Sequence, residues 1–139
     1  MSSPEVWLDA RARIEAAALV PPERVSWPNE AFELPDPTAD PAPLWMAVTA
    51  SSNLAAPIEL GGGGVWQEDG AIWVHCFTPT GTGELALRQL AKAVATTFRD
   101  LPPGPVVYTG AEIGMGEPGD ENGNWYRISV RVEYRYQDL

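Results

Sequence analysis

The segment WYRISVRVEYRY, residues 125–136, alternates two sets of side chains with a period of two. Consecutive side chains of a β-strand point to opposite faces of the sheet, so this pattern predicts a strand. One face carries Tyr126, Ile128, Val130, Val132, Tyr134 and Tyr136. The other face carries Trp125, Arg127, Ser129, Arg131, Glu133 and Arg135. No other segment alternates as cleanly, so this strand is the best-defined element of the expected sheet.

Four further strands are expected, over residues 44–52, 65–67, 71–79 and 106–114. The step Asp69-Gly70, which separates the second and third of these, is typical of a tight hairpin turn. Gly61–Gly64 predict a flexible turn just before the strand at residues 65–67. Apolar side chains occupy both faces of residues 71–79, which favours a central strand.

Two helices are expected, over residues 4–19 and 83–101, with Ser3 and Thr82 as their capping residues. Pro4 suits the first position of the first helix. The apolar face of the first helix is formed by Trp7, Ala10, Ile14 and Ala17. That of the second is formed by Leu87, Leu90, Val94, Phe98 and Leu101.

Residues 21–43 form a proline-rich arm. Seven prolines in this segment exclude a helix or an interior strand, because each removes a backbone donor and fixes φ. Trp27, Phe32 and Leu34 are spaced along it as apolar anchors. Two interpretations follow: the arm packs over the core of its own domain, or part of it crosses to another subunit.

The expected fold class is α+β, with a single antiparallel or mixed sheet packed against two helices in one domain, residues 1–139. Nine basic and nineteen acidic residues give a net charge of −10, which argues against a protein that binds nucleic acid through phosphates. No apolar run is long enough for a membrane span, and the first residues lack the pattern of a secretory signal. We therefore expect a soluble protein made in the cytoplasm.

No catalytic group or cofactor site is expected. The single histidine and cysteine, His75 and Cys76, are neighbours on a strand and point to opposite faces, so they cannot form a nucleophilic pair. Gly81-Thr82-Gly83 resembles the start of a dinucleotide motif but lacks its acidic residue at a strand end, which favours a tight turn instead. Residues 120–131 begin like a calcium loop and lack its glycine and glutamate.

Arg127, Arg131 and Arg135 share one strand face. In one interpretation they form an ordinary exposed face, over which the first helix or the arm could fold. In the other they form a basic stripe that pairs with an acidic patch on a neighbour. Glu117, Asp120 and Glu121 lie in a loop without basic residues and could supply that patch. Subunits with one basic and one acidic surface can associate head to tail into a ring.

Three motifs resemble the tail terminator (tail completion) proteins of long-tailed bacteriophages, over residues 25–136. They are the segment 27–32 (WPNEAF), the junction 77–83 (FTPTGTG) that leads into a helix, and Trp125-Tyr126 at the start of the last strand. The resemblance implies a hexameric ring at the head-proximal end of the tail tube in the virion, which stops tube growth and meets the neck. It implies no enzyme activity and no cofactor.

The same resemblance implies three partners: further copies of the chain, the tail tube protein and a head–tail connector protein, with DNA passing through the ring without specific binding. The candidate interface residues are Trp27, Phe32, Trp66, Asp69, Arg127, Arg131 and Arg135. The segment 61–70 departs from the family, because basic residues are expected there and four glycines followed by Glu68 and Asp69 are found.

Two alternatives remain open from the sequence. One is another virion protein, either a neck or connector component or a tail tube subunit, which would polymerise without limit. The other is a small monomeric enzyme or ligand-binding protein with a site near Gly81–Gly83.

Overall fold

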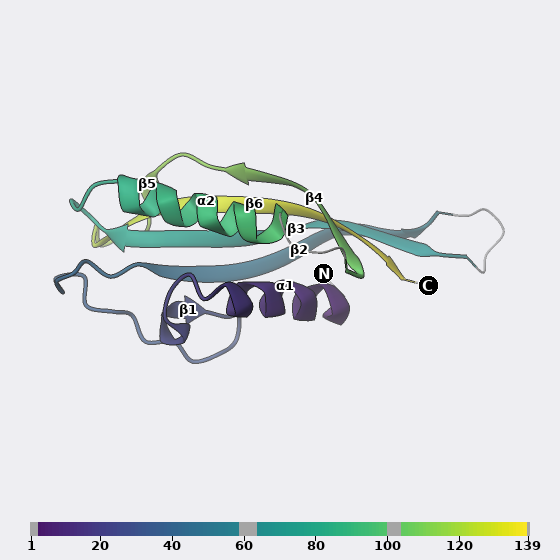
Figure 1. The fold of residues 1–139 in the computed structure, drawn as a ribbon, viewed down its shortest axis with the longest axis horizontal. Helices are drawn as coiled ribbons and strands as arrows, with labels where there is room; N and C mark the ends of the chain where they lie inside the picture. Colours follow the sequence, from purple (N-terminus) through teal and green to yellow (C-terminus); the bar gives the residue numbers. More distant parts are fainter. Residues whose placement is uncertain (1–2, 59–63, 100–103, 139) are drawn as a thin grey trace.

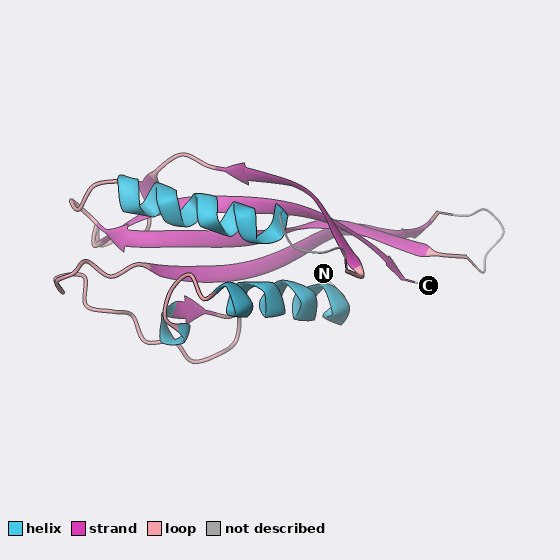
Figure 2. Ribbon diagram, viewed as in Figure 1, coloured by secondary structure: helices cyan, strands magenta, loops and turns pink. Residues whose placement is uncertain are grey.

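The computed structural model describes residues 3–58, 64–99 and 104–138. It contains two α-helices, a short 3-10 helix (η1) and a mixed sheet of six strands (Figures 1 and 2). The elements are α1 (Pro4–Ala17), η1 (Pro22–Arg24), β1 (Val25–Ser26), β2 (Trp45–Pro57), β3 (Trp66–Pro79), α2 (Leu85–Arg99), β4 (Val106–Ile113), β5 (Glu117–Pro118) and β6 (Trp125–Asp138). The predicted α+β class with one sheet and two helices is confirmed.

The strands follow the order β1-β2-β3-β6-β4, with β5 beside β6. β1 runs parallel to β2, and every other pair is antiparallel. β3 and β6 pair along fourteen residues each, from Trp66–Asp138 to Pro79–Trp125. The prediction that residues 71–79 form a central strand is confirmed.

The main core lies between one face of the sheet and both helices. Alternate residues of β3 and β6 contribute to it, as the alternation in 125–136 predicts. Its buried members include Val6, Ala10, Ile14, Met46, Val48, Ile72, Val74, Leu87, Leu90, Val94, Phe98, Ile128, Val130, Val132 and Tyr134. In α1, Val6 is fully buried, whereas the predicted Trp7 and Ala17 are only half-buried.

The predicted hairpin turn at Asp69-Gly70 is wrong, because β3 continues through both residues. Gly70 permits a close approach instead of a turn. A Cβ built on it would lie 2.2 Å from the carbonyl oxygen of Ser51 and 2.6 Å from the hydroxyl of Tyr134. The strands before and after the real connection, β2 and β3, are longer than expected, and Gly61–Gly63 lie outside the described residues.

Both helix caps differ from the expectation. Ser3 occupies the N-cap of α1, but its side chain makes no capping hydrogen bond and binds Glu68 instead. α2 begins at Leu85, and the hydroxyl of Thr82 donates to the carbonyl of Pro79 at 2.7 Å, within the preceding turn. α1 ends at Ala17, two residues earlier than predicted, whereas the predicted last residues of the second helix, Asp100 and Leu101, lie outside the described residues.

The proline-rich arm packs on its own chain. It contains η1 and the edge strand β1, both compatible with the surrounding prolines. Trp27 contacts Trp7 edge-to-face, with ring centroids 5.6 Å apart. Phe32 contacts Trp45 at 5.1 Å. Of the two interpretations of the arm, packing over its own domain accounts for both aromatic anchors. The prediction of Leu34 as a third anchor is wrong, because its side chain is 57% exposed.

Candidate assembly interface

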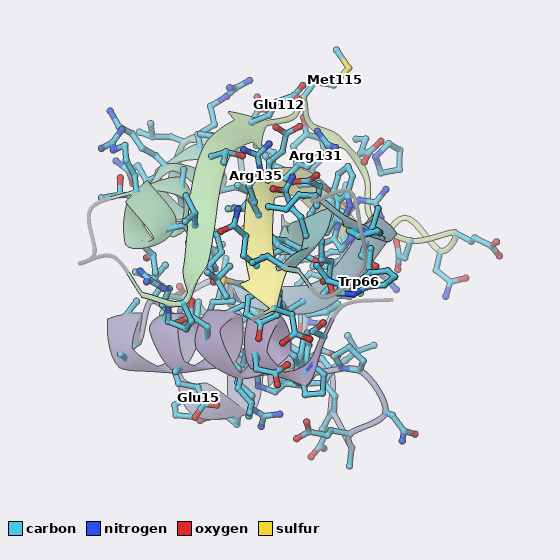
Figure 3. All side chains as sticks on the ribbon, turned by 90° about the vertical axis from the view of Figure 1, so that its right-hand side faces the viewer. Glu15, Trp66, Glu112, Met115, Arg131 and Arg135 are labelled. Atoms are coloured by element: carbon cyan, nitrogen blue, oxygen red, sulfur yellow. The ribbon has the colours of Figure 1, made fainter. Side chains whose placement is uncertain are left out.

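The face of the sheet opposite the helices carries the polar residues of β6. Their cross-strand neighbours follow from the register: His75 pairs with Ser129, Trp73 with Arg131, and Arg131 with Glu112 of β4. Within the described part of the chain no helix packs on this face, which we call the open face. Figure 3 shows Glu112, Arg131 and Arg135 gathered on the side of the molecule away from α1.

A small aromatic cluster covers one end of the open face. Trp45 stacks on Phe77, with centroids 3.9 Å apart and ring planes at 5°, and Trp125 meets Trp45 edge-to-face at 5.7 Å. Trp125 is therefore buried, although the alternation assigned it to the polar face. Phe32 of the arm packs against the same cluster.

The three arginines of the predicted basic stripe do lie on the open face, and each pairs with an acid of its own chain. Arg127 binds Glu117 at 2.7 Å, Arg131 binds Glu133 at 2.5 Å, and Arg135 binds Asp69 at 3.1 Å. All of these side chains are partly exposed, so each pair contributes little to stability. The open face is thus of mixed charge, and Glu117, assigned by the sequence to a neighbour's patch, already has an internal partner.

Of the other predicted interface residues, Asp69 lies on the open face beside Arg135, and Phe32 packs on the aromatic cluster at its end. Trp66 and Trp27 lie away from this face. Trp66 is the first residue of β3, where it pairs with Pro57 and Asp138 at the end of the sheet, and its side chain is 51% exposed. Its side chain belongs to the same strand face as Glu68, opposite to that of Asp69. Trp27 and Phe32 are half-buried against their own chain.

A buried carboxylate was missed by the sequence reasoning. Glu68 is only 5% exposed and accepts hydrogen bonds from the backbone N–H of Ser3 at 3.2 Å, the hydroxyl of Ser3 at 2.5 Å and the hydroxyl of Tyr134 at 2.5 Å. Burial and this carboxylate raise the pKa of the Tyr134 phenol. Continuing the inward alternation of Ile72 and Val74 back along the strand would have placed Glu68 inside.

The structure separates His75 from Cys76 as predicted. The Nδ1 atom of His75 lies 2.7 Å from the hydroxyl of Ser129 on the open face. Cys76 is fully buried in the main core, and burial raises the pKa of its thiol to about 12. A thiol with this pKa is a poor nucleophile at neutral pH.

The Gly81-Thr82-Gly83 junction is a backbone turn. Gly81 and Gly83 adopt φ values of 86° and 89°, a left-handed conformation that favours glycine. Within the described ranges, no group of three His, Cys, Asp or Glu side chains could hold a metal ion. Nor does any helix among these residues have the length and apolar character needed to cross a bilayer.

Comparisons with known proteins place the chain in a family. One solved structure superposes on the whole chain with a TM-score of 0.67; at 19% identity over 100% of this chain and 99% of the other, it supports the fold alone. A search of curated proteins found no match. The family model described as phage tail terminator protein matches residues 5–134 and confirms the resemblance seen in the three sequence motifs. The chain belongs to the phage tail terminator protein family.

Proposed function

We propose that this protein closes into a ring, most simply a hexamer, at the head-proximal end of the tail tube. There it stops tube growth and offers a surface to the connector proteins of the head. The family match over residues 5–134 carries this proposal. The partners are further copies of the chain, the tail tube protein and a connector protein, and no enzymatic step is involved.

Two features of the molecule support assembly. The open face lacks a covering helix in the described part of the chain, although it holds the half-buried Trp73, with the guanidinium of Arg131 5.8 Å from the centre of its ring. Tryptophan and arginine are both enriched at contacts between proteins, so this surface is suited to one. The net charge of −10 is also compatible with DNA sliding through the ring, because acidic walls do not bind phosphates.

Electron microscopy of the purified protein, with and without its tail tube protein, tests the proposal. Closed rings, or tubes capped at one end, are the expected result. Filaments that grow without limit would instead identify a tube subunit. Monomers that ignore the tube contradict the proposal, and a nucleotide panel in a thermal-shift assay would then test the turn at Gly81–Gly83 as a ligand site.

Arg131 is the open-face residue of choice for mutation. Arg131→Glu places a third acid beside Glu112 and Glu133, so we expect weaker ring assembly with an unchanged fold. The double variant Arg131→Glu/Glu133→Arg keeps the net charge and the internal pair, and separates a charge effect from loss of the arginine itself. Rings unchanged in both variants would remove the open face from the interface.

A further inference from the structure

We infer that an acidic loop of each subunit docks into a groove between α1 and α2 of the next copy. The acidic loop comprises residues 33–42, between Phe32 and β2, and the helix groove is the depression between the two helices. This inference rests on the proposed ring and names its intersubunit contact.

The acidic loop is held at both ends and projects between them. It begins beside Phe32, which packs on Trp45, and it ends before Pro43, which is buried. Figures 1 and 2 show it as a loop at the end of the molecule. Because its ends are fixed, the loop does not need to be ordered from a free chain when it binds, which lowers the entropic cost of docking.

The loop has the chemistry of a docking element. It contains Glu33, Asp36 and Asp40 and no basic residue, and Leu34 is 57% exposed at its start. Asp36 accepts hydrogen bonds from the backbone N–H of Thr38 at 2.9 Å and its hydroxyl at 2.7 Å. These bonds lower the pKa of Asp36, so the carboxylate is charged at neutral pH.

The helix groove has complementary chemistry. It is an open depression of about 660 Å³ whose lining includes Ala16 and Ala17 of α1 and Lys92, Ala93 and Thr96 of α2. The alanines leave room for an apolar side chain the size of leucine. In a chain with a net charge of −10, α2 contains three basic residues and no acid. Leu34 therefore fits the apolar floor, and the carboxylates of the loop fit beside Lys92.

The acidic loop and the helix groove are two different surfaces of one subunit, since none of residues 33–42 lines the groove. The acidic loop joins β1 to β2 at one edge of the sheet, whereas α2 packs on β3, β6 and the opposite edge strand, β4. A contact between two different surfaces of identical subunits is heterologous, and it closes into a ring when the rotation permits. This is the geometry that head-to-tail assembly needs.

A charge-swap experiment tests the contact. We expect Lys92→Glu and Asp36→Lys each to weaken ring association by about tenfold or more, and the double variant Lys92→Glu/Asp36→Lys to recover much of that loss. Ring fraction against concentration is measured by sedimentation, and thermal unfolding confirms that each variant folds. Arg88→Glu is the matched control, since Arg88 is one turn earlier on α2, pairs with Glu84 and does not line the groove.

A cross-link supplies an independent readout. Leu34→Cys/Ala93→Cys places one new thiol on each of the two docking surfaces, so oxidation should give a ladder of disulfide-linked oligomers. The native Cys76 does not interfere, because it is fully buried. Intact rings in Lys92→Glu, a double variant no better than the singles, or the absence of a ladder would overturn the docking contact alone. A wild-type protein that stays monomeric with its tube protein contradicts the proposed ring as well.

Discussion

The hydroxyl of Tyr134 in β6 donates a 2.5 Å hydrogen bond to the carboxylate of Glu68 in β3, which is 5% exposed. The same carboxylate accepts the backbone N–H and the hydroxyl of Ser3 at the start of α1. Three segments distant in the sequence therefore meet at one buried charge. A carboxylate at the first residues of a helix is also favoured by the helix dipole.

Replacing Tyr134 with phenylalanine should destabilise the fold by about 1–3 kcal/mol, because it leaves the buried carboxylate short of one donor. Denaturant unfolding measures the loss. Tyr136→Phe is the control, since no hydrogen bond joins the hydroxyl of Tyr136 to the described part of the chain, and it should change stability by no more than about 0.5 kcal/mol. Equal stabilities for the two variants would contradict a structural role for the Glu68 cluster.

Gly70→Ala should be among the more damaging single substitutions in the chain. Its new Cβ would meet the carbonyl oxygen of Ser51 at 2.2 Å and the hydroxyl of Tyr134 at 2.6 Å, and the first of these is backbone. We expect a cost of about 1–3 kcal/mol from overpacking. Gly110→Ala, where a Cβ would have no neighbour within 4 Å, serves as the control in the same unfolding assay. A neutral result would show that Ser51 of β2 and Tyr134 of β6, which flank Gly70 in β3, can shift away from the added methyl group at little cost.

Stability should fall on mild acidification because of His75. Burial and the nearby charge of Arg127 lower its pKa in the folded state below the ordinary value of 6.5. Below pH 6.5 the unfolded chain then binds a proton that the folded chain resists, so stability declines as the pH falls from 6.5 towards the folded pKa. His75→Gln should flatten this part of the stability profile.

The titration of His75 can be followed directly, because it is the only histidine in the sequence. An NMR titration should give a pKa below 6.5, and Arg127→Gln should raise it by removing the cationic neighbour. A pKa at or above the ordinary value would contradict the half-buried position beside Ser129.

Cys76 should resist thiol reagents in the native protein. Its fully buried side chain and raised pKa of about 12 leave little thiolate at pH 8. Reaction with a disulfide reagent should therefore be slow in buffer and fast in denaturant. Thr49→Cys, at an exposed position of β2, provides a second thiol that should react at once. Fast native labelling of Cys76 itself would show that the sheet core opens.

The sequence by itself determined the elements that depend on local periodicity. The alternation in residues 125–136 predicted β6 and its buried face, and the stripe Leu87, Leu90, Val94 and Phe98 predicted α2. It also predicted that His75 and Cys76 point apart, since neighbours on a strand always do. The family motifs could be recognised for the same reason, because they are short and contiguous.

Only the tertiary structure decided features in which distant residues meet. Gly70 follows Asp69 as in a turn, yet the approach of Ser51 and Tyr134 requires a glycine within a strand. Ser3 precedes a helix as a cap does, yet its hydroxyl binds Glu68, 65 positions away. Arg127 pairs with Glu117 because β5 lies beside β6. A local pattern specifies which face a side chain occupies, and three-dimensional packing selects the partner that meets it there.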